Sequence, residues 1–128
     1  MITAQGEKGK TMPKSKYKAH KVYDPEYGWF DSKGEYARWQ DLLLLQKAGV
    51  IVGLKRQVRY ELIPAYVTAK GKKCRAVTYI ADFRYYDSRE GEWVTEDFKG
   101  YVTEVYRLKR KMMYYRYGIE IKETGRYS

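Results

Sequence analysis

The stretch VTYIADFRYYDSREGEWVTEDFKG, from Val77 to Gly100, places the strongest constraint on the fold. Aromatic and β-branched residues fill both halves, which predicts a strand at about residues 76–86 and another at about 93–99. Only the six residues DSREGE separate them. Because so short a connection permits a direct turn and little else, we expect the two strands to pair antiparallel.

The segments around this hairpin also have clear periods. VGLKRQVRYELIP alternates apolar and polar residues from Val52, which predicts a half-buried strand that ends at Pro64. Helical spacing predicts helices at about 32–48, with Ser32 as N-cap, and at about 103–116, closed by Gly118. A short hairpin is expected at 22–30, a basic loop in AKGKKCR, and a last strand in IEIKE at 119–123.

The predicted order is therefore helix, three strands, helix, strand. A right-handed crossover through the second helix would make the last two strands parallel. We thus expect an α/β fold with a mixed four-stranded sheet and a helix on each face. In the second helix, the residues at helical spacing that we expect to be buried are Val105, Leu108, Met112 and Tyr115.

The hairpin carries charged residues at its middle. With 87–92 as the loop, Tyr86 faces Trp93 and Asp82 faces Asp97, and Lys99 shares the face of Asp97. Two opposed carboxylates repel each other, but a divalent cation between them reverses the sign of the interaction. The alternatives are that Lys99 neutralises two surface acids, or that a one-residue slip separates them.

The charge balance favours a polyanionic partner. Lys and Arg outnumber Asp and Glu by 26 to 16, a net charge of +10, and nucleic acid is the first candidate. Residues 1–21 carry six lysines and one acid, which predicts a flexible arm that either contacts phosphates or is simply solvated. The domain proper is then 22–128. The lysines of the arm expected on DNA are Lys14, Lys16 and Lys18.

The remaining composition limits the chemistry. One cysteine and one histidine exclude an internal disulfide and a Cys/His zinc site, so a metal would be held mainly by carboxylates, as Mg²⁺ or Mn²⁺ is. The lack of disulfides fits a reducing cytoplasm, and the run LLLL is too short to span a bilayer. The basic face of the second helix either contacts phosphates or is its wet side; we expect DNA contacts from Arg107, Lys109 and Arg110.

RAVTYIADFRYYD, EDFKG and YRLKRKMMYYRYGIEIKE, with FDSKGEYARW before them, resemble the PD-(D/E)XK nuclease superfamily. More narrowly, they are similar to small phage and prophage endodeoxyribonucleases akin to Holliday-junction resolvases. The similarity runs from about Phe30 to Glu123 and implies a restriction-endonuclease-like core. Ala81 replaces the proline of the family name.

This resemblance implies the site. Asp82 would be the first motif aspartate, and Asp97 and Lys99 the ends of the (D/E)XK triplet. Glu35 matches the glutamate often found on the first helix, although a capping box would explain it equally well. Mg²⁺ or Mn²⁺ would bind Asp82, Asp97, the Phe98 backbone carbonyl and Glu35, and Lys99 would orient the attacking water. Gln57 falls where related sequences often carry a glutamine, which suggests a DNA contact.

The implied activity is metal-dependent hydrolysis of DNA, in particular of branched DNA such as Holliday junctions. A homodimer in the cytoplasm of a bacterial host, encoded by a phage or prophage, is the expected form, because two-fold symmetry matches a four-way junction. The alternatives are a non-catalytic nucleic-acid-binding protein on the same scaffold and an RNA-directed binder. The many tyrosines permit the second of these.

Overall fold

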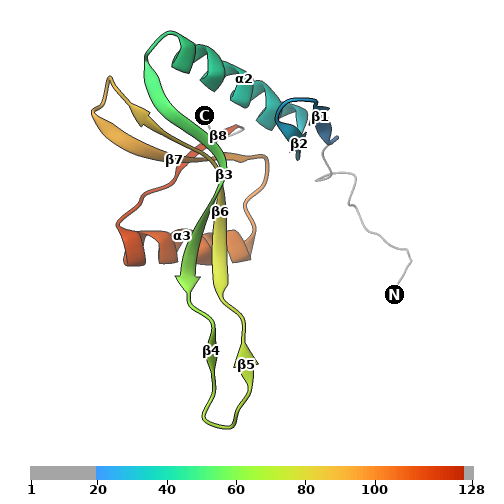
Figure 1. Ribbon diagram of the computed structural model, residues 1–128, viewed down its shortest axis with the longest axis vertical. Coiled ribbons are helices and arrows are strands. Elements are labelled where there is room, and N and C mark those ends of the chain that lie inside the picture. Colours follow the sequence, from blue (N-terminus) through green and yellow to red (C-terminus); the bar gives the residue numbers. More distant parts are fainter. Residues whose placement is uncertain (1–19, 126–128) are drawn as a thin grey trace. The chain divides into compact units, whose positions relative to one another are not determined.

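A computed structural model of the protein describes residues 20–125 (Figure 1). The chain divides within its first described helix into two compact units, residues 1–38 and 39–128. Among the described residues, no helix is long and apolar enough to cross a membrane. The predicted basic arm lies almost wholly outside the described residues, as do Lys14, Lys16 and Lys18.

The first unit contains the hairpin predicted at 22–30. Strands β1 (Val22–Asp24) and β2 (Gly28–Phe30) pair antiparallel, and the Asp24 carboxylate accepts hydrogen bonds from the amides of Glu26 and Tyr27 in the turn. Helix α2 (Lys33–Lys47) starts in this unit, at the predicted cap: the Ser32 hydroxyl accepts a hydrogen bond from the Glu35 amide.

The second unit is built on a mixed four-stranded sheet in the order β3-β6-β7-β8. Strands β3 (Ile51–Ile63), β6 (Val77–Asp87) and β7 (Glu92–Lys99) are antiparallel neighbours, and β8 (Lys122–Gly125) joins β7 in parallel. The predicted pairing of Tyr86 with Trp93 is confirmed. The α/β class and the mixed four-stranded sheet are therefore as the sequence predicts.

Within the second unit, α3 (Glu104–Tyr117) and the part of α2 that starts at Trp39 contact opposite faces of the central strands. Trp39 of α2 stacks on Phe83, whose partner across the hairpin is Glu96. Helix α3 lies on the face of the sheet that carries Lys99. Lys99 and Glu96 lie an odd number of positions apart along β7, so their side chains point to opposite faces. The core on the α3 side consists of Leu62, Tyr79, Ala81, Tyr106, Met113 and Ile121.

The prediction of the buried face of α3 was wrong for three of its four residues. Val105, Leu108 and Tyr115 are exposed by 62%, 59% and 93%, whereas Tyr106 and Met113 are buried. The fourth, Met112, is half-buried and packs against the core as predicted. Both sets follow helical spacing, so periodicity alone cannot choose between them. Tyr106 decides the outcome, because its ring packs against Tyr79 of the sheet and its hydroxyl donates a hydrogen bond to the half-buried Glu123.

Two further boundaries differ from the prediction. The strand expected at 119–123 starts only at Lys122, because Gly118 caps α3 in a left-handed conformation and Ile119 and Ile121 pack into the core. The basic loop AKGKKCR is part of a second hairpin, in which β4 (Tyr66–Val67) pairs with β5 (Lys73–Cys74). Figure 1 shows this hairpin continuing β3 and β6 beyond the sheet.

Candidate active site

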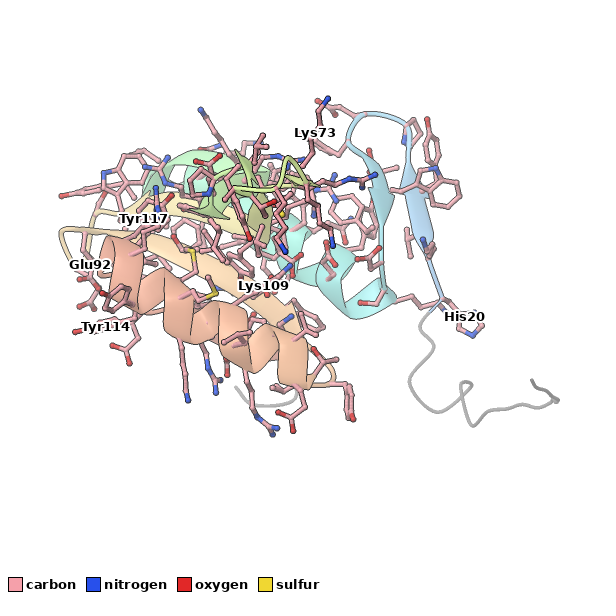
Figure 2. All side chains as sticks on the ribbon, turned by 90° about the horizontal axis from the view of Figure 1, so that it is seen from below. His20, Lys73, Glu92, Lys109, Tyr114 and Tyr117 are labelled. Carbon is pink, nitrogen blue, oxygen red and sulfur yellow. The ribbon has the colours of Figure 1, made fainter. Side chains whose placement is uncertain are left out.

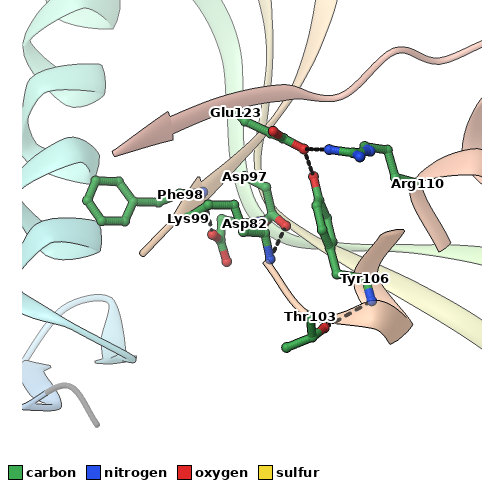
Figure 3. A network of polar contacts seen from close by, with 8 residues as sticks. All are labelled: Asp82, Asp97, Phe98, Lys99, Thr103, Tyr106, Arg110 and Glu123. Carbon is green, nitrogen blue, oxygen red and sulfur yellow. Dashed lines mark hydrogen bonds and ion pairs between the residues drawn. The ribbon is translucent and has the colours of Figure 1, made fainter. Parts of the chain in front are cut away.

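The two aspartates of the hairpin meet where the ladder between β6 and β7 ends. Its last backbone pair is Phe83 with Glu96. One step further, the Asp82 amide donates to Asp97 Oδ1 at 3.1 Å, and the Phe98 amide donates to Asp82 Oδ2 at 2.8 Å (Figure 3). Each carboxylate thus binds the backbone of the opposite strand. This reciprocal pairing holds each carboxylate against the backbone of the facing strand.

Lys99 completes the group. Its ammonium lies 2.9 Å from Asp97 Oδ2 and 3.9 Å from the centre of the Tyr106 ring. The Lys99 side chain is 19% exposed and that of Asp97 only 4%. An ammonium between a carboxylate and an aromatic face is held on two sides while one side stays open to solvent. The structure therefore brings Asp82, Asp97 and Lys99 together, as the hairpin register predicts.

A third acid, Glu123, lies beside Asp97. The parallel register of β7 and β8 makes Asp97 and Glu123 neighbours. Tyr106 Oη and an Arg110 guanidinium nitrogen each approach Glu123 Oε2 to 2.6 Å. Burial by itself would raise the pKa of Glu123, but these two hydrogen bonds and the positive charges of Arg110 and Lys99 together hold that pKa below its ordinary value. Glu123 is therefore ionised and anchors Tyr106 under Lys99.

Tyr79 adds a buried hydroxyl to the same region. Its side chain is 4% exposed, and within residues 20–125 its hydroxyl has no hydrogen-bond partner of good geometry. Burial, followed by the negative charge of Asp97, raises the pKa of Tyr79 far above its ordinary value. Tyr79 is therefore a neutral group with a proton to donate next to the Asp97 carboxylate.

The sheet changes its packing at the position of Asp82. Ala81 packs in the α3 core and Phe83 stacks on Trp39 of α2, although two residues apart should share one face. Gln57 occupies the matching position on β3, between the pairs Arg56–Phe83 and Val58–Ala81. Gln57 is exposed and has a φ of 55°. Among residues 20–125, it is the one residue other than glycine with a positive φ.

The other predicted site residues fall into three groups. Glu35 is buried in the first unit, so its metal-binding role stays a prediction. On α3, Arg107 is exposed and pairs with Glu104 at 3.5 Å, while Lys109 is half-buried. Arg110, expected on DNA, binds Glu123, and its DNA contact stays a prediction. The three lysines of the arm lie outside the described residues.

This arrangement can serve phosphodiester chemistry. Two carboxylates offer hard oxygen ligands, and an adjacent ammonium can stabilise negative charge that develops on a phosphate. Across residues 20–125, no cluster of three or more His, Cys, Asp or Glu side chains is arranged to hold a metal ion.

The sequence reasoning missed Tyr79, Tyr106 and Glu123. A signal for Glu123 was available, because the crossover predicts β7 and β8 to be parallel neighbours and both carry acids. The register that aligns Glu123 with Asp97 depends on how α3 packs, however. The tyrosines gave no signal, since the chain has fifteen of them and most have packing roles.

Comparison with known proteins gives one match. A family model described as "Protein of unknown function (DUF1064)" matches residues 14–126, which is most of the chain. No curated protein and no solved structure matches. The matched range includes every residue of the acidic site.

Proposed function

We propose that this chain, which belongs to the DUF1064 family, is a metal-dependent endodeoxyribonuclease with a restriction-endonuclease-like core. One observation carries the proposal: Asp82 and Asp97 face each other across the hairpin and Lys99 lies 2.9 Å from Asp97. Selection for stability alone favours opposite charges, not two acids, at opposed positions of a sheet. A site for a divalent cation explains the pair.

The donor set fits Mg²⁺ or Mn²⁺. Mg²⁺ usually keeps several waters and binds one or two carboxylates together with substrate phosphates. Asp82 and Asp97 supply the two carboxylates, and the resemblance adds the Phe98 carbonyl and Glu35 as further oxygen ligands. When bound, such an ion lowers the pKa of a coordinated water and neutralises charge on the phosphoryl oxygens.

Lys99 is the residue of this chain that we assign to the reacting phosphate. Its ammonium has three donors, and the Asp97 carboxylate accepts from one side only. The Tyr106 ring stabilises the positive charge without accepting a full hydrogen bond, which leaves donors for a phosphate oxygen or the attacking water. Glu123 and Arg110 hold Tyr106 in place, so they position Lys99 indirectly.

The finer parts of the proposal come from the resemblance. They are branched DNA as the preferred substrate, a two-fold homodimer, and a phage- or prophage-encoded protein acting in a bacterial cytoplasm. The net charge of +10 supports a polyanionic substrate. A non-catalytic DNA-binding protein on the same scaffold is the alternative, and cleavage assays separate the two.

The test uses labelled linear duplex and four-way-junction DNA with Mg²⁺, Mn²⁺ or EDTA. We expect cleavage with either metal and none with EDTA. Asp82→Asn and Asp97→Asn should each lower cleavage at least 100-fold and weaken Mn²⁺ binding in calorimetric titration. An asparagine amide oxygen can still accept the backbone hydrogen bonds, so both variants should fold.

Asp41→Asn is the matched control, because Asp41 is an exposed aspartate on α2. It should cleave DNA and bind Mn²⁺ like the wild type. Duplex binding without cleavage under any of these metal conditions would contradict the nuclease and favour the non-catalytic alternative. Equal Mn²⁺ affinity in the wild type and both site variants would remove the metal site.

A further inference from the structure

The second hairpin, residues 64–76, projects from the sheet and has no role in the acidic site. It continues β3 and β6 and carries β4 and β5, with Tyr66 opposite Cys74 and Val67 opposite Lys73 (Figure 1). We call residues 64–76 the basic hairpin. Tyr66 and Val67 are 54% and 62% exposed, so its strands bury little of their own surface. A segment that projects without packing gains nothing for the core.

Its charge is of one sign. Residues 62–81 contain four basic side chains and no acidic one. All four are exposed, and within the described part of the chain none of them has an ion pair: Lys70, Lys72, Lys73 and Arg75. Figure 2 shows the Lys73 side chain extending away from the ribbon. Clustered like charges repel one another, so this arrangement favours binding of a polyanion.

The tip of the basic hairpin is an ordered turn. The Thr68 amide donates to the Lys72 carbonyl at 2.8 Å, and the Lys72 amide donates to the Thr68 hydroxyl at 3.0 Å. Gly71 supplies the positive φ of 89° that the turn needs, and its amide donates to the Thr68 carbonyl. A turn closed by three hydrogen bonds holds the backbone that carries the lysines in one conformation, which lowers the backbone entropy lost on binding.

We propose that the basic hairpin inserts into the major groove of duplex DNA. That groove is about 12 Å wide and admits a two-stranded β-ribbon. The exposed lysines would contact the phosphates that flank the groove, and Tyr66 and Val67 would lie against base edges. The inference rests on the proposed function only in taking DNA as the ligand.

The reach of the hairpin suits this role. Strands rise about 3.3 Å per residue, so the twelve residues from Asp82 back to Lys70, which include the turn at the tip, span at most roughly 40 Å. One turn of duplex DNA is about 34–36 Å long. A duplex with a phosphate at Asp82 would therefore meet the tip within about one helical turn. The basic hairpin would thus grip the DNA arm that leads away from the site of cleavage.

The test removes charge from the tip with the triple variant Lys70→Ala, Lys72→Ala, Lys73→Ala. Binding to a labelled 30-base-pair duplex is measured by fluorescence anisotropy over a range of salt concentrations, in EDTA and in an Asp82→Asn background, so that no cleavage occurs. Each lost phosphate contact lowers the slope of log K against log salt by about 0.9. We expect the slope to become shallower by about 2–3.

A control of equal charge separates contact from net charge. Lys33, Lys47 and Lys55 are exposed lysines outside residues 64–76, and their triple alanine variant should keep the wild-type slope. Methyl green, which occupies the major groove, should weaken binding of the wild type more than that of the hairpin variant. Equal slopes in the two triple variants, stronger competition by a minor-groove ligand, or equal binding to polyglutamate would overturn the proposal.

These outcomes are independent of the nuclease. A wild type that cleaves DNA while the hairpin variant keeps its slope would refute the hairpin contact alone. If the wild type never cleaves DNA but the hairpin variant has a shallower slope of log K against log salt, the nuclease is refuted. The basic hairpin then remains a duplex-binding element.

Discussion

Gln57 is the residue whose backbone most clearly departs from its local preference. Its φ of 55° lies in the left-handed region, although it stands within a thirteen-residue strand. That conformation costs a residue with a Cβ roughly 1–2 kcal/mol. Gln57 faces the position of Asp82, at the point where both strands change their packing partner. Strain of this kind often marks a functional site, which agrees with the role proposed for Asp82.

Gln57→Gly tests whether the side chain is needed. Glycine adopts positive φ freely, so the free energy of unfolding should stay unchanged or rise by up to about 1 kcal/mol. If the amide contacts DNA, cleavage should fall at least tenfold. Urea unfolding and single-turnover cleavage measure the two effects. Gln57→Val serves as the control for strain and should lower stability. Full activity of the glycine variant would show that only the backbone conformation matters.

Glu35→Gln separates a metal ligand from a helix cap. Glutamine can still complete a capping box, so stability should change by less than about 1 kcal/mol, while cleavage should fall at least tenfold. Ser32→Ala is the matched control: it removes the acceptor of the Glu35 amide and should cost about 1 kcal/mol without a comparable loss of cleavage. A Glu35→Gln variant that cleaves at the normal rate would leave Glu35 as a cap.

At the level of the elements, α3 links the core to the candidate site. Met113 is fully buried in the core, while Tyr106, two turns earlier on the same face, supports Lys99 and binds Glu123. The same helical face therefore provides apolar packing at one end and positions the charged group at the other. This double role explains why a tyrosine, with an apolar ring and a polar tip, occupies position 106.

Alanine substitutions can verify which face of α3 is buried. Met113→Ala should lower the free energy of unfolding by about 2–5 kcal/mol, because it opens a cavity in the core. Leu108→Ala, at a position 59% exposed, should change it by no more than about 0.5 kcal/mol. Urea denaturation followed by circular dichroism gives both values. A larger loss of stability for Leu108→Ala than for Met113→Ala would show that the face expected from the sequence is the buried one.

At the level of the whole molecule, we predict a homodimer that acts on branched DNA. One chain offers one acidic site, and symmetric cleavage of two strands requires two sites related by a two-fold axis. Light scattering with and without junction DNA should give twice the chain mass of 15.2 kDa for the protein component. A cruciform plasmid should receive paired nicks on opposite strands.

The control for this prediction is linear duplex of the same sequence. It should be cut at least tenfold more slowly than the cruciform. A monomer that cuts both substrates at equal rates would leave a general nuclease and remove the resolvase assignment.

The sequence by itself determined the features that depend on neighbours along the chain. The short connection within the hairpin from Val77 to Gly100 favours the register with Tyr86 opposite Trp93, and the structure has that register rather than the one-residue slip. Ser32 and Gly118 fix helix ends for equally local reasons, since one supplies an acceptor and the other a left-handed backbone. Asp82, Asp97 and Lys99 follow from that register.

Only the tertiary structure decided the features that depend on distant partners. Two faces of α3 fit the helical period equally well. Tyr106 faces inward because its ring contacts the Lys99 ammonium and its hydroxyl donates a hydrogen bond to Glu123. Glu123 aligns with Asp97 through packing of a whole crossover, which no local pattern encodes. The positive φ of Gln57 likewise arises at the position where β3 and β6 change from packing against one helix to packing against the other.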